Sequence, residues 1–346
     1  MGLHHYADML FRSGRIAAFQ AGLQEVVRPG MRVLEVGSGL GTYSFFAARA
    51  GADRVTAVES DPVVHVARAV ASRNGLAQRV EFVHARAPEG IPAGRYDVVV
   101  FEDYPTSFMD QATWELLEVI RDRHLAPGGV LFPESVRFGL APVVGAHRAS
   151  RPRGDGDPDG DPGGQTGGGT ESATEERPET ETEKGSDTEI YGLDWTPLRS
   201  HLANTGRKVE LAPASLGGAK SVTPARRILA REASFDWTVS GEWSSRGEVW
   251  IGLAFWFDLH LGGDRWVCNH PQARSEPWGQ WLLPLDPPVA LAGDVTATAR
   301  VWRDLDPEGG PGWMGWSCSW PGGERRGHEF AGVPLSAEDL GRRPAG

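Results

Sequence analysis

A glycine-rich turn between a strand and a helix most constrains how this 346-residue chain can fold. The apolar run Met31–Val36 leads into GSGLG at positions 37–41, and a helical pattern follows over Tyr43–Ala50. Glycines at a strand-to-helix turn let a ligand approach the backbone, and the helix N-terminus favours polar or anionic groups. A dinucleotide fingerprint has its third glycine one place later, where this chain has Thr42. The turn therefore predicts a ligand site that does not fit the dinucleotide spacing.

Strand-like and helix-like segments alternate on both sides of this turn. Short runs rich in β-branched residues recur, and apolar residues at helical spacing fill the intervals between them. Such alternation is typical of a parallel sheet covered by helices on both faces. The expected strands are Met31–Val36, Arg54–Glu59, Arg79–Val83 and Asp97–Phe101, and the expected helices include Tyr43–Ala50, Pro62–Asn74 and Gln111–Leu125. We predict an α/β Rossmann-like domain over residues 1–147.

The net charge of −11 comes almost entirely from one segment. Between Gly154 and Glu189 there are twelve acidic and two basic residues, so the rest of the chain is nearly neutral. Residues 148–189 carry almost no large apolar side chains, which predicts an acidic, disordered linker. Residues 190–335 have strand-like runs between Gly/Pro turns and are rich in Trp, which predicts an antiparallel β-barrel-like domain. Residues 336–346 are expected to form a flexible tail.

Composition and charge narrow the class of protein further. No stretch approaches the ~20 apolar residues that span a bilayer, and the N-terminus lacks a basic region followed by an apolar run. Cys268 and Cys318 form neither a disulfide framework nor a zinc set, so we predict a reduced, cytoplasmic protein without a metal site. A nucleic-acid binder would show a basic face, whereas the body of this chain is nearly neutral. We therefore expect neither a membrane nor a nucleic-acid partner.

The glycine spacing resembles the loop of a different cofactor. G-x-G-x-G after the acidic Glu35 resembles the S-adenosylmethionine (SAM) loop of class I methyltransferases, and SAM has no pyrophosphate to cradle. In VTAVES, the carboxylate of Glu59 falls at the end of its expected strand, beside the glycine loop. There it can accept hydrogen bonds from both ribose hydroxyls, a role common to NAD and SAM sites. A generic nucleotide site and a mere tight turn are the alternatives.

With these residues in view, the chain resembles the protein arginine methyltransferase family across nearly its full length, apart from the acidic linker. The resemblance rests on YADMLFRSGR, VLEVGSGLGTYSFFAARAGADRVTAVES, LAPGGVLFPESV, YGLDWTPL and RSEPWGQWLLPLDPPVALAGD. It implies SAM as cofactor, with Arg15 paired to the SAM carboxylate. It also implies a homodimer, because the stretch Arg199–Val222 is about long enough for the family's dimerisation arm. The residues that it implicates in cofactor binding are Arg15, Glu35, Gly37, Ser38, Gly39, Gly41, Thr42, Glu59 and Ala87.

The sequence departs from the family where the family binds its substrate. The family holds the target guanidinium between two glutamates on the loop after the fourth strand. Glu102 fits the first of these, but Gln111 stands at the second, with Asp110 one place short. The family's Thr-His-Trp loop reads Glu276-Pro277-Trp278, which keeps only the tryptophan. The chain is therefore similar to a divergent member, with a degenerate double-Glu loop and a degenerate Thr-His-Trp loop.

The remaining carboxylates still suit methyl transfer. This reaction is an in-line displacement, for which orientation alone can supply ~7–11 kcal/mol. Glu102 is the predicted orienting group and base, since it follows the fourth strand and a carboxylate pairs well with a guanidinium. Asp103, Asp110 and Trp278 are predicted to complete the catalytic set. The alternatives are a helix N-cap or a solvated turn for Glu102 and Asp103, a helix N-cap for Asp110 and a core position for Trp278.

We predict a SAM-dependent N-methyltransferase. Its acceptor is expected to be an arginine, a guanidine or an amine, carried by a protein, a peptide or a small molecule. One alternative is a small-metabolite N- or O-methyltransferase of a biosynthetic pathway. The other is a non-catalytic SAM-binding scaffold.

Overall fold

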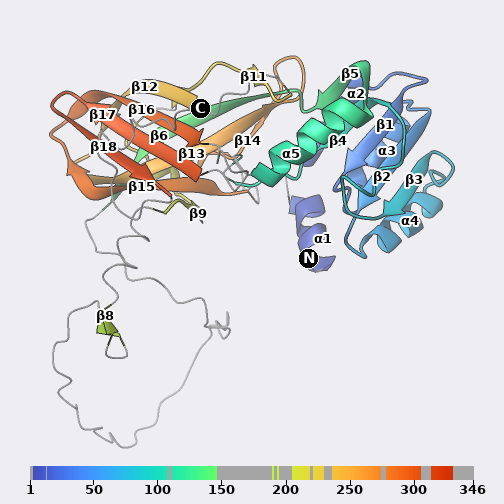
Figure 1. The fold of residues 1–346 in the computed structure, drawn as a ribbon, viewed down its shortest axis with the longest axis horizontal. Helices are drawn as coiled ribbons and strands as arrows, with labels where there is room; N and C mark the ends of the chain where they lie inside the picture. The colour runs from blue at the N-terminus through green and yellow to red at the C-terminus, as the bar shows by residue number, and fades with distance from the viewer. Residues whose placement is uncertain are drawn as a thin grey trace, which may run out of the picture.

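The structure is a computed structural model of the whole chain. It describes residues 3–12, 14–106, 108, 111–145, 189–190, 193–194, 205–218, 221–229, 236–273, 278–304 and 313–329. Most of the predicted acidic linker (148–189) and the whole of the predicted tail (336–346) lie outside the described residues. Within them, an α/β unit and a β-rich unit lie side by side (Figure 1).

The α/β unit is built on a five-stranded sheet with the order β3-β2-β1-β4-β5, and every pair in it is parallel. The strands are β1 (Arg32–Val36), β2 (Arg54–Glu59), β3 (Val80–His84), β4 (Tyr96–Phe101) and β5 (Leu125–Phe132). The chain moves outward from β1 to β3 and then returns to the other side of β1 with β4. Ligands of open α/β sheets bind at such a reversal, outside the carboxyl ends of the strands.

The register brings the strand ends of this reversal together. Val36, the last residue of β1, pairs with Val58 on one side and with Phe101 on the other. Residues 37–41, Glu59 and Glu102 therefore leave the sheet at the same edge. Four consecutive residues of β1, five of β2 and four of β4 are buried, because helices cover the sheet.

Among the described residues, five α-helices belong to this unit. They are α1 (Leu3–Arg12), α2 (Arg15–Val26), α3 (Thr42–Arg49), α4 (Val64–Arg73) and α5 (Gln111–Val119), and α5 continues as the π-helical turn η1 (Ile120–His124). Phe19 of α2 stacks on Tyr43 of α3 with ring centroids 4.5 Å apart, which fixes these two helices beside β1. None of the described helices is long and apolar enough to cross a membrane.

Where the structure describes it, the β-rich unit has two large antiparallel sheets. One has the order β10-β6-β13-β15-β9, with β11 on β6 and β14 on β13, and the other has the order β12-β16-β17-β18. The bounds are β6 (Ser135–Gly145), β9 (Arg207–Val209), β10 (Ser221–Val222), β11 (Arg226–Arg227), β12 (Asp236–Ser244), β13 (Val249–His260), β14 (Trp266–Cys268), β15 (Gln280–Ala290), β16 (Asp294–Asp304), β17 (Trp313–Trp320) and β18 (Gly323–His328); the short η2 (Pro213–Ser215) and the hairpin β7 (Glu189–Ile190) with β8 (Leu193–Asp194) complete the list.

Strand β6 differs from the domain division that we expected. It lies within residues 1–147, yet it pairs antiparallel with β13 from Ser135 to Gly145. Its side chains are buried along almost its whole length, so it needs a partner sheet on both faces. The β-rich unit thus takes its first strand from residues that precede the acidic segment, and β6 carries the chain from one unit to the other (Figure 1).

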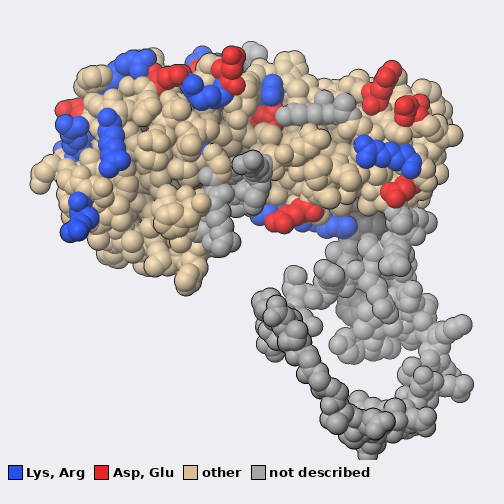
Figure 2. All heavy atoms as spheres, turned by 180° about the vertical axis from the view of Figure 1, so that it is seen from behind, with Lys and Arg blue, Asp and Glu red and all other residues tan. Residues whose placement is uncertain are grey.

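Tryptophans fill the interior of the β-rich unit. Four of them, Trp243, Trp250, Trp256 and Trp316, are fully buried. Trp256 packs directly on Gly139 of β6, where an added Cβ would lie 2.0 Å from the indole ring. Trp237, Trp278 and Trp302 are buried as well. On the outside, Lys/Arg and Asp/Glu side chains are interspersed among uncharged residues on the face seen in Figure 2.

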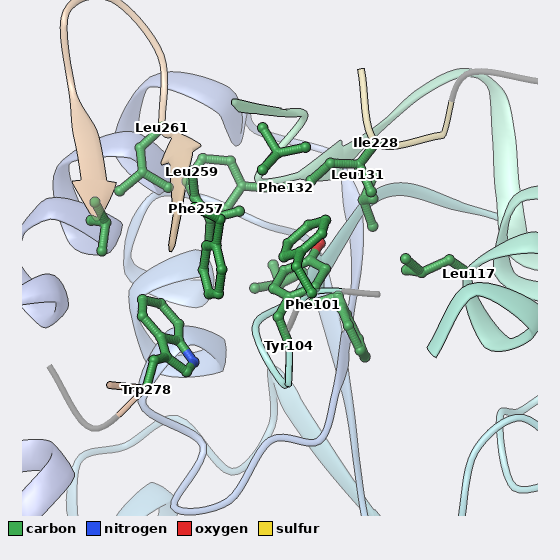
Figure 3. Close-up of a cluster of buried hydrophobic side chains, with 14 of the residues drawn as sticks. Phe101, Tyr104, Leu117, Leu131, Phe132, Ile228, Phe257, Leu259, Leu261 and Trp278 are labelled. Carbon is green, nitrogen blue, oxygen red and sulfur yellow. The ribbon is translucent and has the colours of Figure 1, made fainter. Parts of the chain in front are cut away.

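An aromatic cluster joins the two units. Phe101 and Tyr104 at the end of β4 face Phe257 of β13 and Trp278 (Figure 3). Tyr104 stacks on Phe108 at 4.5 Å, and Phe108 lies 5.0 Å from Phe257 between ring centroids. The two units therefore share one continuous core beside the carboxyl ends of β1 and β4, the edge at which open α/β sheets bind their ligands.

Candidate active site

The glycine loop follows β1 in a conformation that requires glycine. Gly37, Gly39 and Gly41 have φ angles of 73°, 52° and 74°, which side chains rarely adopt. At Gly41, an added Cβ would also lie 2.7 Å from the Phe82 ring. The Gly37 amide donates to the Val58 carbonyl of β2 at 2.9 Å, which ties the loop to the neighbouring strand. The loop therefore presents backbone, without side chains, to the carboxyl edge of the sheet.

Glu59 holds the middle of this loop. Its Oε2 accepts the Gly39 amide at 2.7 Å, and its Oε1 accepts the Asp61 amide at 2.7 Å. Each oxygen keeps a lone pair that could accept a hydroxyl group. The hydroxyl of Ser38, buried in the same loop, has no hydrogen-bond partner among the described residues. A pair of ribose hydroxyls and a polar cofactor tail fit these open positions, so the loop is compatible with SAM.

Glu35 is placed differently from the other cofactor candidates. Its side chain is buried, and its Oε2 accepts both the amide and the hydroxyl of Ser44, the amide at 2.7 Å. Burial raises the pKa of Glu35 to about 8, against the lowering effect of these two hydrogen bonds. The contacts fix the first turn of α3, which begins at Thr42 immediately after the loop. In this structure Glu35 holds the helix that shapes the site.

Arg15 and Glu102 meet on the other side of the site. Nη2 of Arg15 lies 3.2 Å from Oε1 of Glu102, and both side chains are largely buried. The Arg15 guanidinium also lies over the Trp278 ring, 4.5 Å from its centroid, and donates to the Met9 sulfur at 3.6 Å. The resemblance implies a SAM carboxylate as the partner of Arg15. In this structure Arg15 instead contacts the carboxylate that we predicted to bind the acceptor.

Trp278 is buried, and hydrogen bonds to its own carbonyl and to that of Gly279 fix the backbone around it. The Thr106 hydroxyl donates to the Trp278 carbonyl at 2.5 Å, and Nδ2 of Asn269 donates to the Gly279 carbonyl at 2.6 Å. Asn269 also accepts the Phe257 amide at 2.8 Å, so one buried amide side chain joins β13 to the loop before β15. These contacts fix the indole against Arg15 and make Trp278 a wall of the site.

Asp103 lies on the cofactor side of the strand end. Its Cβ is 3.6 Å from the position that a Cβ on Gly37 would take. Surrounding protein atoms and the charge of Glu59 raise the pKa of Asp103, although its side chain keeps access to solvent. The neighbouring Glu102 contacts Arg15, so two consecutive carboxylates serve two different parts of the site.

Several predicted residues are less well placed or lie outside the described residues. Asp110 and Glu276 are not described, and the side chain of Gln111 is not described either, although Gln111 begins α5. Ala87 follows β3 and packs at the edge of the core. The structure therefore brings together the glycine loop, Glu59, Asp103, Glu102, Arg15 and Trp278.

Two residues of the site, Tyr6 and Asn269, were not predicted from the sequence. Tyr6 of α1 covers the loop, since a Cβ on Gly39 would lie 3.0 Å from its ring. Burial and the nearby carboxylates raise the pKa of Tyr6 to about 12. Asn269, described above, was also missed. Tyr6 lies within YADMLFRSGR and could have been considered there, whereas Asn269 acts only through strand pairing and left no sequence signal.

Comparisons with known proteins find matches to the α/β unit. Residues 33–129 match the family described as "Methyltransferase domain". Ribosomal protein arginine N-methyltransferase rmt3 of Schizosaccharomyces pombe is 32% identical over 36% of this chain, which spans 23% of that protein's length. Protein arginine N-methyltransferase PRMT10 of Arabidopsis thaliana is 33% identical over 45% of this chain and 41% of its own length. The chain thus spans less than half the length of these two relatives.

One relative matches over a much longer stretch. Arginine N(omega)-methyltransferase of Streptomyces achromogenes subsp. streptozoticus is 28% identical over 87% of this chain and 76% of its own length.

Solved structures match the fold of the whole chain. The PRMT1 enzyme-prozyme heterotetrameric complex of Trypanosoma brucei with AdoHcy has a TM-score of 0.72 at 16% identity, over 97% of this chain and 99% of that one. Arabidopsis thaliana protein arginine methyltransferase 10 has a TM-score of 0.66 at 19% identity, over 97% and 96%. The predicted Rossmann-like methyltransferase domain followed by an antiparallel β domain is confirmed.

Proposed function

We propose that this chain, which has a class I methyltransferase domain and the two-domain fold of the protein arginine methyltransferases, transfers a methyl group from SAM to a nitrogen of an arginine or a related guanidine. The observation that carries the proposal is the position of Glu102. Its carboxylate lies at the reversal point of the sheet, within 3.2 Å of Arg15. The glycine loop and Glu59 leave the same edge of the sheet, as the register of β1 requires.

The residues divide into a cofactor side and an acceptor side. Glu59 would accept the ribose hydroxyls with the lone pairs that Gly39 and Asp61 leave open. Arg15 would bind the cofactor carboxylate, with Ser38 as a further polar contact. When bound, SAM supplies an electrophilic methyl group on a sulfonium, which leaves without needing an acid.

On the acceptor side, Glu102 orients the nucleophile. A planar guanidinium can donate two hydrogen bonds to one carboxylate, which fixes both its distance and its plane. Glu102 would hold the acceptor nitrogen toward the methyl group and receive the proton that it loses. The buried indole of Trp278 excludes water from this side, because its backbone is tied to Thr106.

The proposal includes free arginine or another small guanidine among the acceptors. The Streptomyces achromogenes relative, which matches 87% of this chain, is named for arginine, without mention of a protein. The relatives named for protein substrates match over less than half of the chain. A homodimer and a cytoplasmic location also stay proposals, and light scattering tests the first of them.

An acceptor screen tests the proposed function. The full chain is incubated with SAM carrying a deuterated methyl group and, separately, with free arginine, small guanidines, small amines and an arginine-rich peptide. Mass spectrometry then detects the labelled product. We expect label on a guanidine nitrogen. Label only on a hydroxyl or an amine would support the small-metabolite alternative, and SAM binding without any product would support the scaffold alternative.

A further inference from the structure

Asp103 and Glu102 are adjacent in sequence but face different neighbours. Glu102 reaches Arg15 at 3.2 Å. The Asp103 side chain instead lies against the glycine loop, with Cβ at 3.6 Å and Oδ2 at 3.9 Å from the position of a Cβ on Gly37. Gly37 has a φ angle of 73°, so the backbone in front of Asp103 is bare. Asp103 therefore faces the cofactor loop.

Asp103 shares this place with another carboxylate. The charge of Glu59 acts on Asp103, and both Glu59 and Asp103 act on the Tyr6 hydroxyl. Within the part of the chain that the structure describes, the Asp103 carboxylate has no ion-pair or hydrogen-bond partner. Ser38, in the same loop, is only 6% exposed, and its buried hydroxyl has no hydrogen-bond partner among the described residues. Two acidic groups and an unsatisfied hydroxyl thus surround one bare stretch of backbone, which is an arrangement that a cationic ligand would stabilise.

We propose that the Asp103 carboxylate binds the positive charge that SAM carries between its ribose and its carboxylate. This inference rests on the proposed function and adds a residue to it. Glu59 lies at the ribose end of the proposed site and Arg15 at the carboxylate end. Asp103 directly follows Glu102, which contacts Arg15, and its side chain lies beside Gly37 within reach of the Glu59 charge. We therefore place Asp103 at the part of the cofactor between the ribose and the carboxylate.

Two cationic groups occupy that part of SAM, the sulfonium and the α-ammonium. Both would be attracted by a carboxylate, but they behave differently on turnover. S-adenosylhomocysteine, the product, keeps the α-ammonium and has lost the sulfonium charge. The difference in affinity between SAM and this product therefore identifies the group that Asp103 binds.

The test is the affinity of the full chain for SAM and for S-adenosylhomocysteine, measured by calorimetry. Asp103→Asn keeps the shape of the side chain and removes its charge. Asp53→Asn is the matched control, because Asp53 is exposed and lies just before β2, at the opposite edge of the sheet. We expect Asp103→Asn to weaken SAM binding about tenfold, the effect of one charge-assisted contact. The control should bind like the wild type.

The outcomes separate as follows. Weaker binding of SAM alone identifies the sulfonium, and equal weakening of SAM and S-adenosylhomocysteine identifies the α-ammonium. Unchanged or tighter SAM binding by Asp103→Asn overturns the inference while leaving the proposed function in place. A wild-type chain that binds no SAM overturns both. Thermal unfolding of each variant separates a loss of contact from a loss of fold.

Discussion

The contact between Arg15 and Glu102 predicts an unusual stability cycle. Replacing Arg15 with Met keeps most of its buried volume but leaves the Glu102 carboxylate without the guanidinium beside it. Replacing Glu102 with Gln removes that charge. We expect Glu102→Gln to destabilise the wild type and, in contrast, to stabilise the Arg15→Met variant, because there it removes a buried charge that has lost its counter-ion.

The magnitude follows from the geometry. At a separation of 3.2 Å and an effective dielectric constant of about 20, two unit charges attract by about 5 kcal/mol before desolvation is counted. Breaking a buried pair from one side costs about 3–5 kcal/mol. The Glu102 side chain is 20% exposed, so Arg15→Met should cost about 3 kcal/mol, at the low end of this range. The coupling in the cycle should exceed about 1 kcal/mol.

Urea unfolding of the four proteins, without SAM, measures this coupling. The matched control is the exposed pair of Arg54 and Glu81, whose side chains are 62% and 50% exposed. Its cycle of Arg54→Met and Glu81→Gln should couple by less than about 1 kcal/mol, since such pairs are screened by water. If Glu102→Gln lowers the free energy of unfolding equally in the wild type and in Arg15→Met, the reasoning about the buried pair is refuted.

Three further predictions concern the surroundings of the site. The pKa of Glu35 is raised to about 8, so this carboxyl group binds more protons in the folded than in the unfolded chain. The free energy of unfolding should therefore fall as the pH rises from 4.5 toward 8. In urea unfolding, the Glu35→Gln variant should lack this slope. Asn269→Ala removes two buried side-chain hydrogen bonds and should cost about 2 kcal/mol in the same assay. We also expect a lower methylation rate, because the backbone next to Trp278 loses its support; an unchanged rate would contradict the role of Trp278 as a wall of the site. Arg137 forms an ion pair with Asp258, whose side chain is 1% exposed. Arg137→Met should lower the free energy of unfolding more than Asp258→Asn does, because it removes the cation from beside a buried carboxylate. The reverse order would contradict this reasoning.

Local signals were sufficient to predict the α/β unit. Expected strand Arg54–Glu59 coincides with β2, and Asp97–Phe101 lacks only the first residue of β4. These strands are buried on both faces and bounded by turns, so their apolar runs stand out. Strand β6 was missed as part of the β-rich unit, because its partner β13 follows only after the acidic segment and sequence pattern cannot report such pairing.

The same distinction between local pattern and long-range pairing applies to the candidate site. The glycine loop and Glu59 could be predicted, because each stands at a strand end whose neighbours are fixed by the sheet. The contact of Thr106 with Trp278 joins residues that are 172 positions apart, and no local pattern encodes it. The direction in which the Asp103 side chain points could not be predicted either. Strand β4 ends at Phe101, and the alternation of side chains between the two faces of the sheet ends with it.

In the proposed mechanism, Glu102 holds the methyl acceptor while the glycine loop and Arg15 hold SAM. Its most direct test measures, for Glu102→Gln, both the turnover of the acceptor found in the screen and the affinity for SAM, with Glu81→Gln as the exposed control. We predict a loss of at least about a hundredfold in kcat. The affinity for SAM should stay within about threefold of the wild type, well below the effect of losing one charge-assisted contact. Undiminished turnover by Glu102→Gln would contradict the account.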